Sequence, residues 1–153
     1  MIYILIILIG LVLDRLTKLY AINNFIDNPI DLGWIKLTYL ENRGAAFGIL
    51  QNKRTIFIIL TVTIVFLICI YFIKNIKYNS KLINISIAFI ISGALGNFYD
   101  RVINHYVVDF IDVNFNGKFN FPVFNVADIF VTVGCIFLMF LILGDKDVSK
   151  NRK

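Results

Sequence analysis

The chain of 153 residues contains one histidine and two cysteines, and this scarcity argues against several kinds of active site. There is no His-Glu-x-x-His sequence, which argues against a zinc peptidase of that type, and no Gly-Lys-Ser/Thr phosphate-binding loop. The histidine, His105, lies outside the apolar runs, so a serine–histidine mechanism lacks its parts. Cys69 and Cys135 both lie inside apolar runs, where a cysteine is typically a small packing residue rather than half of a disulfide or a metal ligand.

Acidic residues are also scarce, with 10 Asp and Glu against 15 Lys and Arg. The net charge of +5 does not indicate nucleic-acid binding, because the basic residues are not gathered on one polar face. Hydrophobic residues make up 59% of the chain, above the roughly 45–50% of an average globular protein. The length leaves room for one domain. We therefore predict a single integral membrane domain over residues 1–153.

Four apolar segments come close to the roughly 20 residues that span a bilayer. We predict an α-helical membrane protein with four transmembrane helices and a strand-like stretch at Trp34–Leu40. The first segment has no basic start and no cleavage pattern, so it is read as a retained helix. The helices are predicted at about 2–22, 56–73, 82–99 and 123–143, with outer segments at 23–55 and 100–122, a cytoplasmic loop at 74–81 and a cytoplasmic tail at 144–153.

The basic residues predict the orientation. Lys74, Lys77 and Lys81 fall in the loop between two spans, and further basic residues lie in the tail. Short basic segments are typical of the cytoplasmic side, so both termini are expected there. Under this topology the polar residues of the first, third and fourth helices meet at the outer end of the bundle. An aspartate in a lipid-spanning segment is costly and is usually functional.

Two polar groups lie on helix faces where a structural role competes with a functional one. Asp14 and Lys18 are four residues apart and can pair, either as an ion pair that orients the helix or with the lysine reaching to the interface. Asn97, Asp100 and Arg101 also share a face, and Arg101 could hold Asp100 as a charge-assisted pair.

The best candidates for chemistry are Asp128 and Asp109. Asp128 shares a face with Asn125, has no basic neighbour in sequence and would lie about 8 Å inside a helix that begins at 123. Asp109 lies in the outer segment that can fold over the site, and Asp112 is a weaker competitor. Two close carboxylates share one proton, so one can activate water while the other binds a scissile carbonyl.

Three readings remain open at this point. A peptidase would use the acids for catalysis, whereas a small proton- or ion-coupled carrier would space them along a path through the membrane. A non-enzymatic scaffold would use them only as structural ion pairs. The predicted clustering at one end of the bundle favours the peptidase.

Four blocks of sequence, in order, resemble the lipoprotein signal peptidase (signal peptidase II) family of bacterial intramembrane aspartic peptidases. Together they cover most of the chain. The blocks are Asp14–Lys18 (Asp-Arg-Leu-Thr-Lys), Glu41–Gly48 (Glu-Asn-Arg-Gly-Ala-Ala-Phe-Gly), Gly93–Arg101 with Val107–Phe110 (Val-Val-Asp-Phe), and Phe121–Asp128 (Phe-Pro-Val-Phe-Asn-Val-Ala-Asp).

The resemblance implies cleavage of a prolipoprotein signal peptide before its diacylglyceryl-modified cysteine, at the outer face of the bacterial cytoplasmic membrane. It implies no metal, no cofactor and no obligate protein partner, and contacts only with such substrates and membrane lipids. It also implies a small extracytoplasmic β-sheet and an outer arm. The catalytic pair would be Asp109 and Asp128. The supporting positions would be Asp14, Lys18, Asn42, Gly44, Asn97, Asp100, Arg101 and Asn125.

Overall fold

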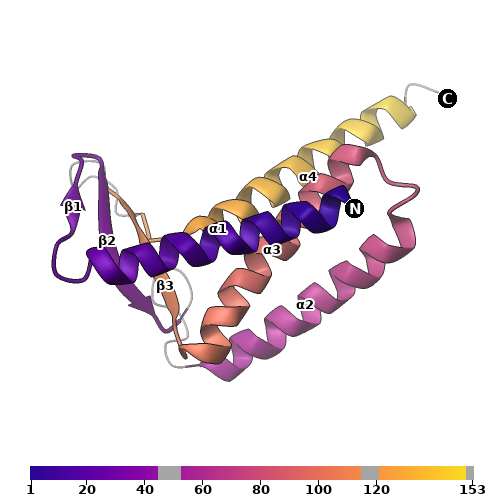
Figure 1. The fold of residues 1–153 in the computed structure, drawn as a ribbon. Helices are drawn as coiled ribbons and strands as arrows, with labels where there is room; N and C mark the ends of the chain where they lie inside the picture. Colours follow the sequence, from indigo (N-terminus) through magenta and orange to yellow (C-terminus); the bar gives the residue numbers. More distant parts are fainter. Residues whose placement is uncertain (45–52, 115–120, 151–153) are drawn as a thin grey trace.

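The computed structural model describes residues 1–44, 53–114 and 121–150, including their side chains except at 54 and 144–150. The described chain forms a bundle of long helices with a small sheet at one end (Figure 1). The beginning of the first helix and the end of the last lie at the other end of the bundle (Figure 1). The elements are α1 (Ile2–Asn24), β1 (Ile30–Asp31), β2 (Ile35–Asn42), α2 (Arg54–Asn75), α3 (Lys81–Ile103), β3 (Val107–Val113) and α4 (Val126–Lys150).

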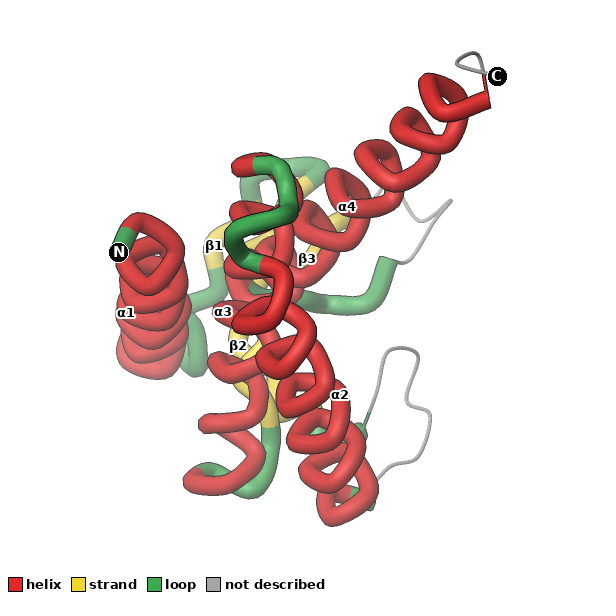
Figure 2. The backbone as a smooth tube through the Cα atoms, turned by 90° about the vertical axis from the view of Figure 1, so that its right-hand side faces the viewer, coloured by secondary structure: helices red, strands yellow, loops and turns green. Residues whose placement is uncertain are grey.

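Helix α3 is the centre of the bundle and packs against α1, α2 and α4. Figure 2 shows α1 and α2 on different sides of α3. Small residues let the helices approach closely, as is usual in membrane bundles. A Cβ atom at Gly93 would collide with the carbonyl oxygen of Ala127, and one at Gly134 would lie 2.7 Å from that of Ser86.

The three strands form an antiparallel sheet in the order β1–β2–β3. Asn42 lies opposite Val107 and Leu40 opposite Asp109, with an irregular register between Leu37 and Leu40. The strand expected at Trp34–Leu40 is therefore present as β2, shifted slightly toward the C-terminus. Ala21 and Phe25, at the end of α1, pack against Phe110 of β3 and hold the sheet against the bundle.

The predicted start and end of the last helix were wrong. The helix expected at 123–143 begins at Val126, and the expected polar tail is helical as far as Lys150. Residues 121–125 lie before the helix, and Phe124 forms a bridge with Ile111 of β3. Pro122 has no backbone N–H and favours extended backbone before it, which is consistent with this late start.

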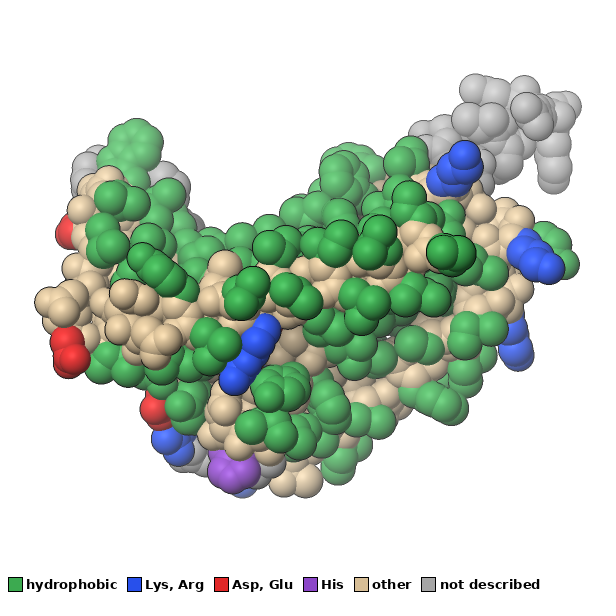
Figure 3. All heavy atoms as spheres, viewed as in Figure 1, with side chains coloured by type: hydrophobic (Ala, Val, Ile, Leu, Met, Phe, Trp, Pro, Cys, Tyr) green, Lys and Arg blue, Asp and Glu red, His purple; other side chains and the backbone are tan. Residues whose placement is uncertain are grey.

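Among the residues that the structure describes, three helices are long and apolar enough to cross a membrane: Thr55–Asn75, Lys81–Ile103 and Val126–Leu143. Helix α1 does not meet this criterion, and Asp14, Arg15 and Lys18 interrupt its apolar run. Asp14 and Lys18 are nevertheless buried at 3% and 0% exposure, so their charges face the protein. Away from its ends, the molecule has a largely hydrophobic surface on the face shown in Figure 3.

Candidate active site

Asp109 is buried in the third strand, at the end of the helix bundle that carries the sheet. Its side chain accepts two hydrogen bonds, one from the Asn42 amide at 2.8 Å and one from the Asn125 amide at 2.6 Å. Asn42 is brought there by the pairing of β2 with β3. The strand pairing and the beginning of α4 therefore fix the two oxygens of this carboxylate independently.

Asp128 lies in the first turn of α4, not about 8 Å inside the helix as predicted. Its Oδ2 atom accepts a hydrogen bond from the backbone N–H of Asn125, and the Asn125 side chain accepts one from the backbone N–H of Asp128. This reciprocal pair is a capping box, which satisfies two backbone donors that a helix start leaves unpaired. The Asn-x-x-Asp spacing was a sequence signal for a helix start at 126, and it was missed.

Two asparagines connect the two aspartates to the rest of the bundle. The Asn125 amide, which is completely buried, donates to Oδ1 of Asp109, to Oδ1 of Asn97 and to the carbonyl oxygen of Val108. Asn97 in turn donates to Oδ1 of Asp128 at 2.7 Å. Asp109 and Asp128 are thus held by one shared network of amide side chains.

A buried cation lies beneath this network. Lys18 is completely buried, and its Nζ atom lies 2.9 Å from Asp14, 2.9 Å from Asp100 and 3.0 Å from Oδ1 of Asn97. The predicted pairing of Lys18 with Asp14 is confirmed, but the alternative in which Lys18 reaches the interface is wrong. A buried lysine needs such partners because unpaired burial of its charge is strongly unfavourable.

Asp14 and Asp100 also hold backbone groups in place. Asp14 accepts a hydrogen bond from the N–H of Ala127 at 3.0 Å, and Asp100 accepts one from the N–H of Val108 at 3.2 Å. Ala127 and Val108 immediately precede Asp128 and Asp109. The supporting acids therefore anchor the backbone beside each member of the pair.

Burial, and to a smaller extent the negative charge of Asp128, raise the pKa of Asp109 to about 7. The hydrogen bonds from Asn42 and Asn125, and the charge of Lys18, act in the opposite direction. A carboxyl group with this pKa is partly protonated near neutral pH. The electrostatic effect of Asp128 on Asp109 is that expected of two carboxyl groups sharing one site.

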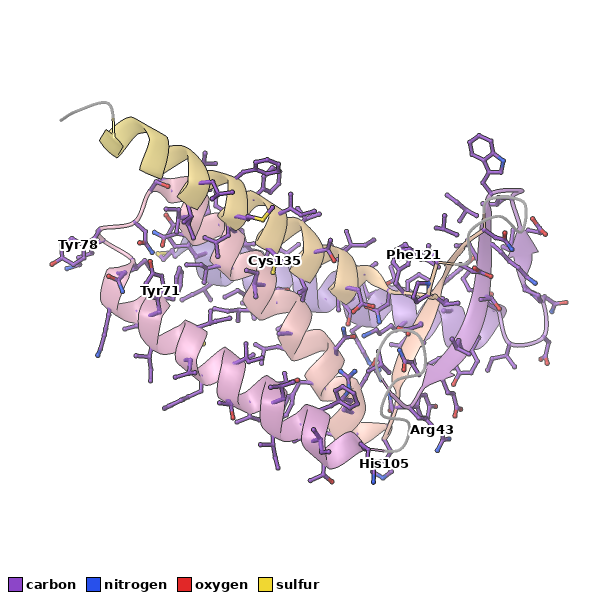
Figure 4. All side chains as sticks on the ribbon, turned by 180° about the vertical axis from the view of Figure 1, so that it is seen from behind. Arg43, Tyr71, Tyr78, His105, Phe121 and Cys135 are labelled. Carbon is purple, nitrogen blue, oxygen red and sulfur yellow. The ribbon has the colours of Figure 1, made fainter. Side chains whose placement is uncertain are left out.

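Both aspartates line a cavity of about 540 Å³ at the start of α4. Asn42, Arg101 and Thr132 are the other polar residues that line it, and the rest of its wall is hydrophobic, formed by 121–124, Val107, Ile129 and Val133. Figure 4 shows Phe121 between the start of α4 and the sheet. The sequence analysis did not identify this hydrophobic wall as part of the site.

Arg101 and Asp100 each have partners that the sequence analysis did not name. Asp100 forms ion pairs with Lys18 and, at 3.7 Å, with Arg15, neither of which was predicted as its partner. The Arg101 guanidinium lies over the ring of Phe57 at 5.0 Å and donates to the carbonyl oxygens of Asn97 and Gly44.

The remaining candidates can also be placed. Gly44 donates its N–H to the Asn42 side chain, which joins it to the network. Asp112 lies opposite Lys36 in the sheet and does not line the cavity. The rest of the second sequence block, from 45 onward, lies outside the described residues. Among the residues that the structure describes, no group of three His, Cys, Asp or Glu side chains could hold a metal ion.

The chain is similar to known proteins both in its sequence and in its fold. The family model for signal peptidase (SPase) II matches residues 6–144. The lipoprotein signal peptidase of Clostridium tetani is 42% identical over 98% of this chain and 97% of its own length. That of Caldicellulosiruptor bescii is 44% identical, covering 100% and 99% of the two chains.

A solved structure described as a bacterial membrane enzyme is similar to this one with a TM-score of 0.84 and 38% identity. The match covers 99% of this chain and 91% of that one. Both the sequence and the fold therefore agree over almost the whole length. The chain belongs to the signal peptidase II family, and it is a membrane-embedded protease.

Proposed function

We propose that this protein is an aspartic endopeptidase that removes the signal peptide from diacylglyceryl-modified prolipoproteins, with Asp109 and Asp128 as its catalytic residues. The observation that carries the proposal is that these two carboxylates line one cavity and both accept hydrogen bonds from Asn125, Asp109 from its side-chain amide and Asp128 from its backbone N–H. The names of the relatives point to the same substrate class.

The pair would act with one proton between them. The ionised carboxylate removes a proton from water, and the protonated one donates a hydrogen bond to the carbonyl oxygen of the scissile bond. Water attacks the carbonyl carbon, and the proton then passes to the leaving amine as the peptide bond breaks. The pair titrates as a unit, so the two roles belong to the pair rather than to fixed residues.

The wall of the cavity suits a lipid-modified substrate. Its apolar part, formed by Phe121, Val123 and Ile129 among others, can take apolar chains, whereas Asn42 and Arg101 can bind polar groups near the scissile bond. Such a combination of a hydrophobic wall with a few polar groups is typical of small-molecule and lipid sites. The substrate would enter with its diacylglyceryl group still in the bilayer.

The proposed orientation has four spans, with α1 as the fourth, both termini in the cytoplasm and the active site near the outer face of the membrane. The buried positions of Asp14 and Lys18 are compatible with α1 crossing the bilayer. The acidic side chains visible in Figure 3 lie near the sheet end, whereas basic side chains lie at both ends, so at the end opposite the sheet only basic ones are visible, as is usual on the cytoplasmic side.

The test is cleavage of a purified diacylglyceryl-modified prolipoprotein by the wild type and by Asp109→Asn and Asp128→Asn, each in the same bilayer. Asp112→Asn is the matched control, because Asp112 lies on the same strand as Asp109 but does not line the cavity. Each catalytic variant should lose activity by about 10²–10⁴-fold, the usual contribution of general acid–base catalysis. Circular dichroism and the unfolding temperature check that each variant is folded.

The outcomes separate the competing functions. Near-normal turnover by a folded Asp109→Asn or Asp128→Asn would remove that residue from the mechanism. Absence of cleavage by the wild type, together with proton flux across the vesicle, would favour the ion-coupled carrier instead. Normal turnover by Asp112→Asn shows that the loss does not follow from removing any acid on the strand.

A further inference from the structure

A second crevice lies between α1 and α3, and it shares no lining residue with the active-site cavity. It has a volume of about 320 Å³. Leu11 and Val12 form an apolar part, and Arg15 and Tyr99 form a polar part. Val12 and Tyr99 are 55% and 44% exposed, so the crevice opens to the surroundings of the bundle.

Arg15 is the cation that this crevice presents to the outside. Its side chain is 37% exposed, and its guanidinium lies 5.1 Å from the centre of the Tyr99 ring. The Nη1 atom is buried, and no hydrogen-bond acceptor within the described part of the chain pairs with it. Its nearest carboxylate oxygen, Oδ1 of Asp100, is 3.7 Å away. Nη1 therefore lacks an acceptor, and the exposed part of the Arg15 side chain lies beside the open apolar crevice.

The two carboxylates at the floor of the crevice are already satisfied. Asp14 and Asp100 are 3% and 1% exposed, and each lies 2.9 Å from Nζ of Lys18. Each also accepts a backbone N–H from another element. Their charges are turned inward, so Arg15 is the charged group that an outside ligand would meet.

We propose that this crevice binds an anionic phospholipid, with its phosphate on Arg15 and Tyr99 and an acyl chain along Leu11 and Val12. The assignment follows from charge and position. Tyr99 lies four residues before the end of α3, about 6 Å from the end that carries the sheet. Tyrosine at that depth is typical of the membrane interface, where lipid phosphates lie, and arginine is the residue suited to bidentate phosphate binding.

This lipid would be distinct from the substrate. The proposed peptidase reaction uses the cavity at the start of α4, whereas the crevice lies between α1 and α3. Lipid binding there does not depend on the peptidase reaction, so either proposal can fail without the other. The ligand is defined by its chemistry: a negatively charged headgroup without a compensating positive charge, attached to acyl chains.

The experiment measures binding of short-chain phosphatidylglycerol to the full chain in a neutral detergent, by native mass spectrometry and by the rise in unfolding temperature. Phosphatidylcholine of the same chain length and inorganic phosphate are the comparison ligands. The wild type should bind phosphatidylglycerol about tenfold more tightly than phosphatidylcholine. Arg15→Gln should abolish this preference, whereas Lys74→Gln, which removes one exposed charge at the other end of the bundle, should retain it.

A second variant keeps the test decisive if Arg15→Gln does not fold. Val12→Trp fills the crevice and leaves the contact between Arg15 and Asp100 in place, so it should weaken binding of phosphatidylglycerol about tenfold. A phosphatidylglycerol preference retained in folded Arg15→Gln, or unchanged binding in Val12→Trp, would overturn the proposal. Inorganic phosphate binding as tightly as the lipid would also overturn it, because the acyl chain would then contribute nothing.

Discussion

The side chain of Asn97 donates a hydrogen bond of 2.7 Å to Oδ1 of Asp128. The same side chain accepts a hydrogen bond of 3.0 Å from Lys18 through its oxygen. Because an amide group is planar, these two contacts fix its orientation, with the oxygen toward the cation and the nitrogen toward the aspartate. A positive charge that is completely buried is thereby linked to the proposed catalytic carboxylate through one side chain.

Replacing Lys18 by methionine should therefore damage both stability and activity. The variant leaves Asp14 without its lysine partner and removes the contact that orients Asn97. Breaking a buried ion pair by removing one partner costs about 3–5 kcal/mol of unfolding free energy. The measurement is unfolding in detergent together with prolipoprotein cleavage. Lys74→Met, an exposed position at the other end, is the control, and equal stability of the two variants would contradict this role.

The pH dependence of cleavage should reflect the pKa of Asp109, which burial and the charge of Asp128 raise to about 7. Above this pH the shared proton is lost and both carboxylates become charged. We expect kcat/KM to fall as the pH rises through about 7. The profile is measured with a substrate of constant charge over the range, and a profile without a descending limb near neutral pH would contradict the shared proton.

Asn42→Ala should move that descending limb to higher pH. The hydrogen bond from Asn42 to Oδ2 of Asp109 stabilises the ionised form, so its removal raises the pKa of Asp109 further above about 7. Turnover should also decrease, because Asn42 lines the cavity. The control is Asn24→Ala, at an exposed helix end. Loss of folding in Asn42→Ala would instead show that Asn42 is structural.

The stability of the protein should fall as the pH rises from about 4 to about 7, as far as Asp109 controls it. An unfolded aspartate loses its proton near pH 3.9, whereas folded Asp109 keeps it to about 7. In this interval the unfolded state binds fewer protons, so rising pH favours it. The effect is on the order of 4 kcal/mol, because one pKa unit corresponds to about 1.4 kcal/mol.

Asp109→Asn tests this effect directly, because asparagine does not titrate. The stability of the variant relative to the wild type should increase between pH 4 and 7 and stay constant above. Hydrogen bonds lost in the variant change its unfolding free energy by an amount that does not depend on pH. The test is therefore the change with pH in the difference between variant and wild type. A difference in unfolding free energy that stays constant over this interval would show that Asp109 ionises normally.

Gly96→Ala should displace Asp14, which supports the active site. A Cβ atom at this position would lie 2.6 Å from Oδ2 of Asp14 and 3.3 Å from Cβ of Ala127. Asp14 would have to move, although it holds both Lys18 and the N–H of Ala127. Overpacking of this kind costs about 1–3 kcal/mol. The measurement is unfolding free energy and cleavage rate, and wild-type values for both would show that the helices separate freely here.

The sequence was sufficient for relationships that act within one helix. The i, i+4 spacing of Asp14 and Lys18 predicted their ion pair, and the length of the apolar runs predicted the long helices. It was not sufficient for contacts between elements, such as the pairing of Lys18 with Asp100 across 82 positions of the chain. Such contacts depend on how helices pack, which spacing along one helix does not encode.

For the start of the last helix, hydrophobicity was given more weight than a local capping signal. The apolar residues at 123 and 124 suggested a helix start there, but both precede the helix, and Phe124 bridges to Ile111 of β3. The spacing of Asn125 and Asp128, which form a capping box, indicated the correct helix start. The contact of the Arg101 guanidinium with Phe57 of another helix had no signal in the sequence.

The two aspartates come from different kinds of element, Asp109 from a strand and Asp128 from a helix. The strand is held to the bundle by a small cluster of Ala21, Phe25 and Phe110, whereas the helices pack along their whole length. Heating should therefore inactivate the enzyme before the helices melt, because detachment of the sheet alone separates the pair. Cleavage activity would therefore be lost when the sheet detaches from the bundle, whereas the helical content of the same sample would not change at that temperature.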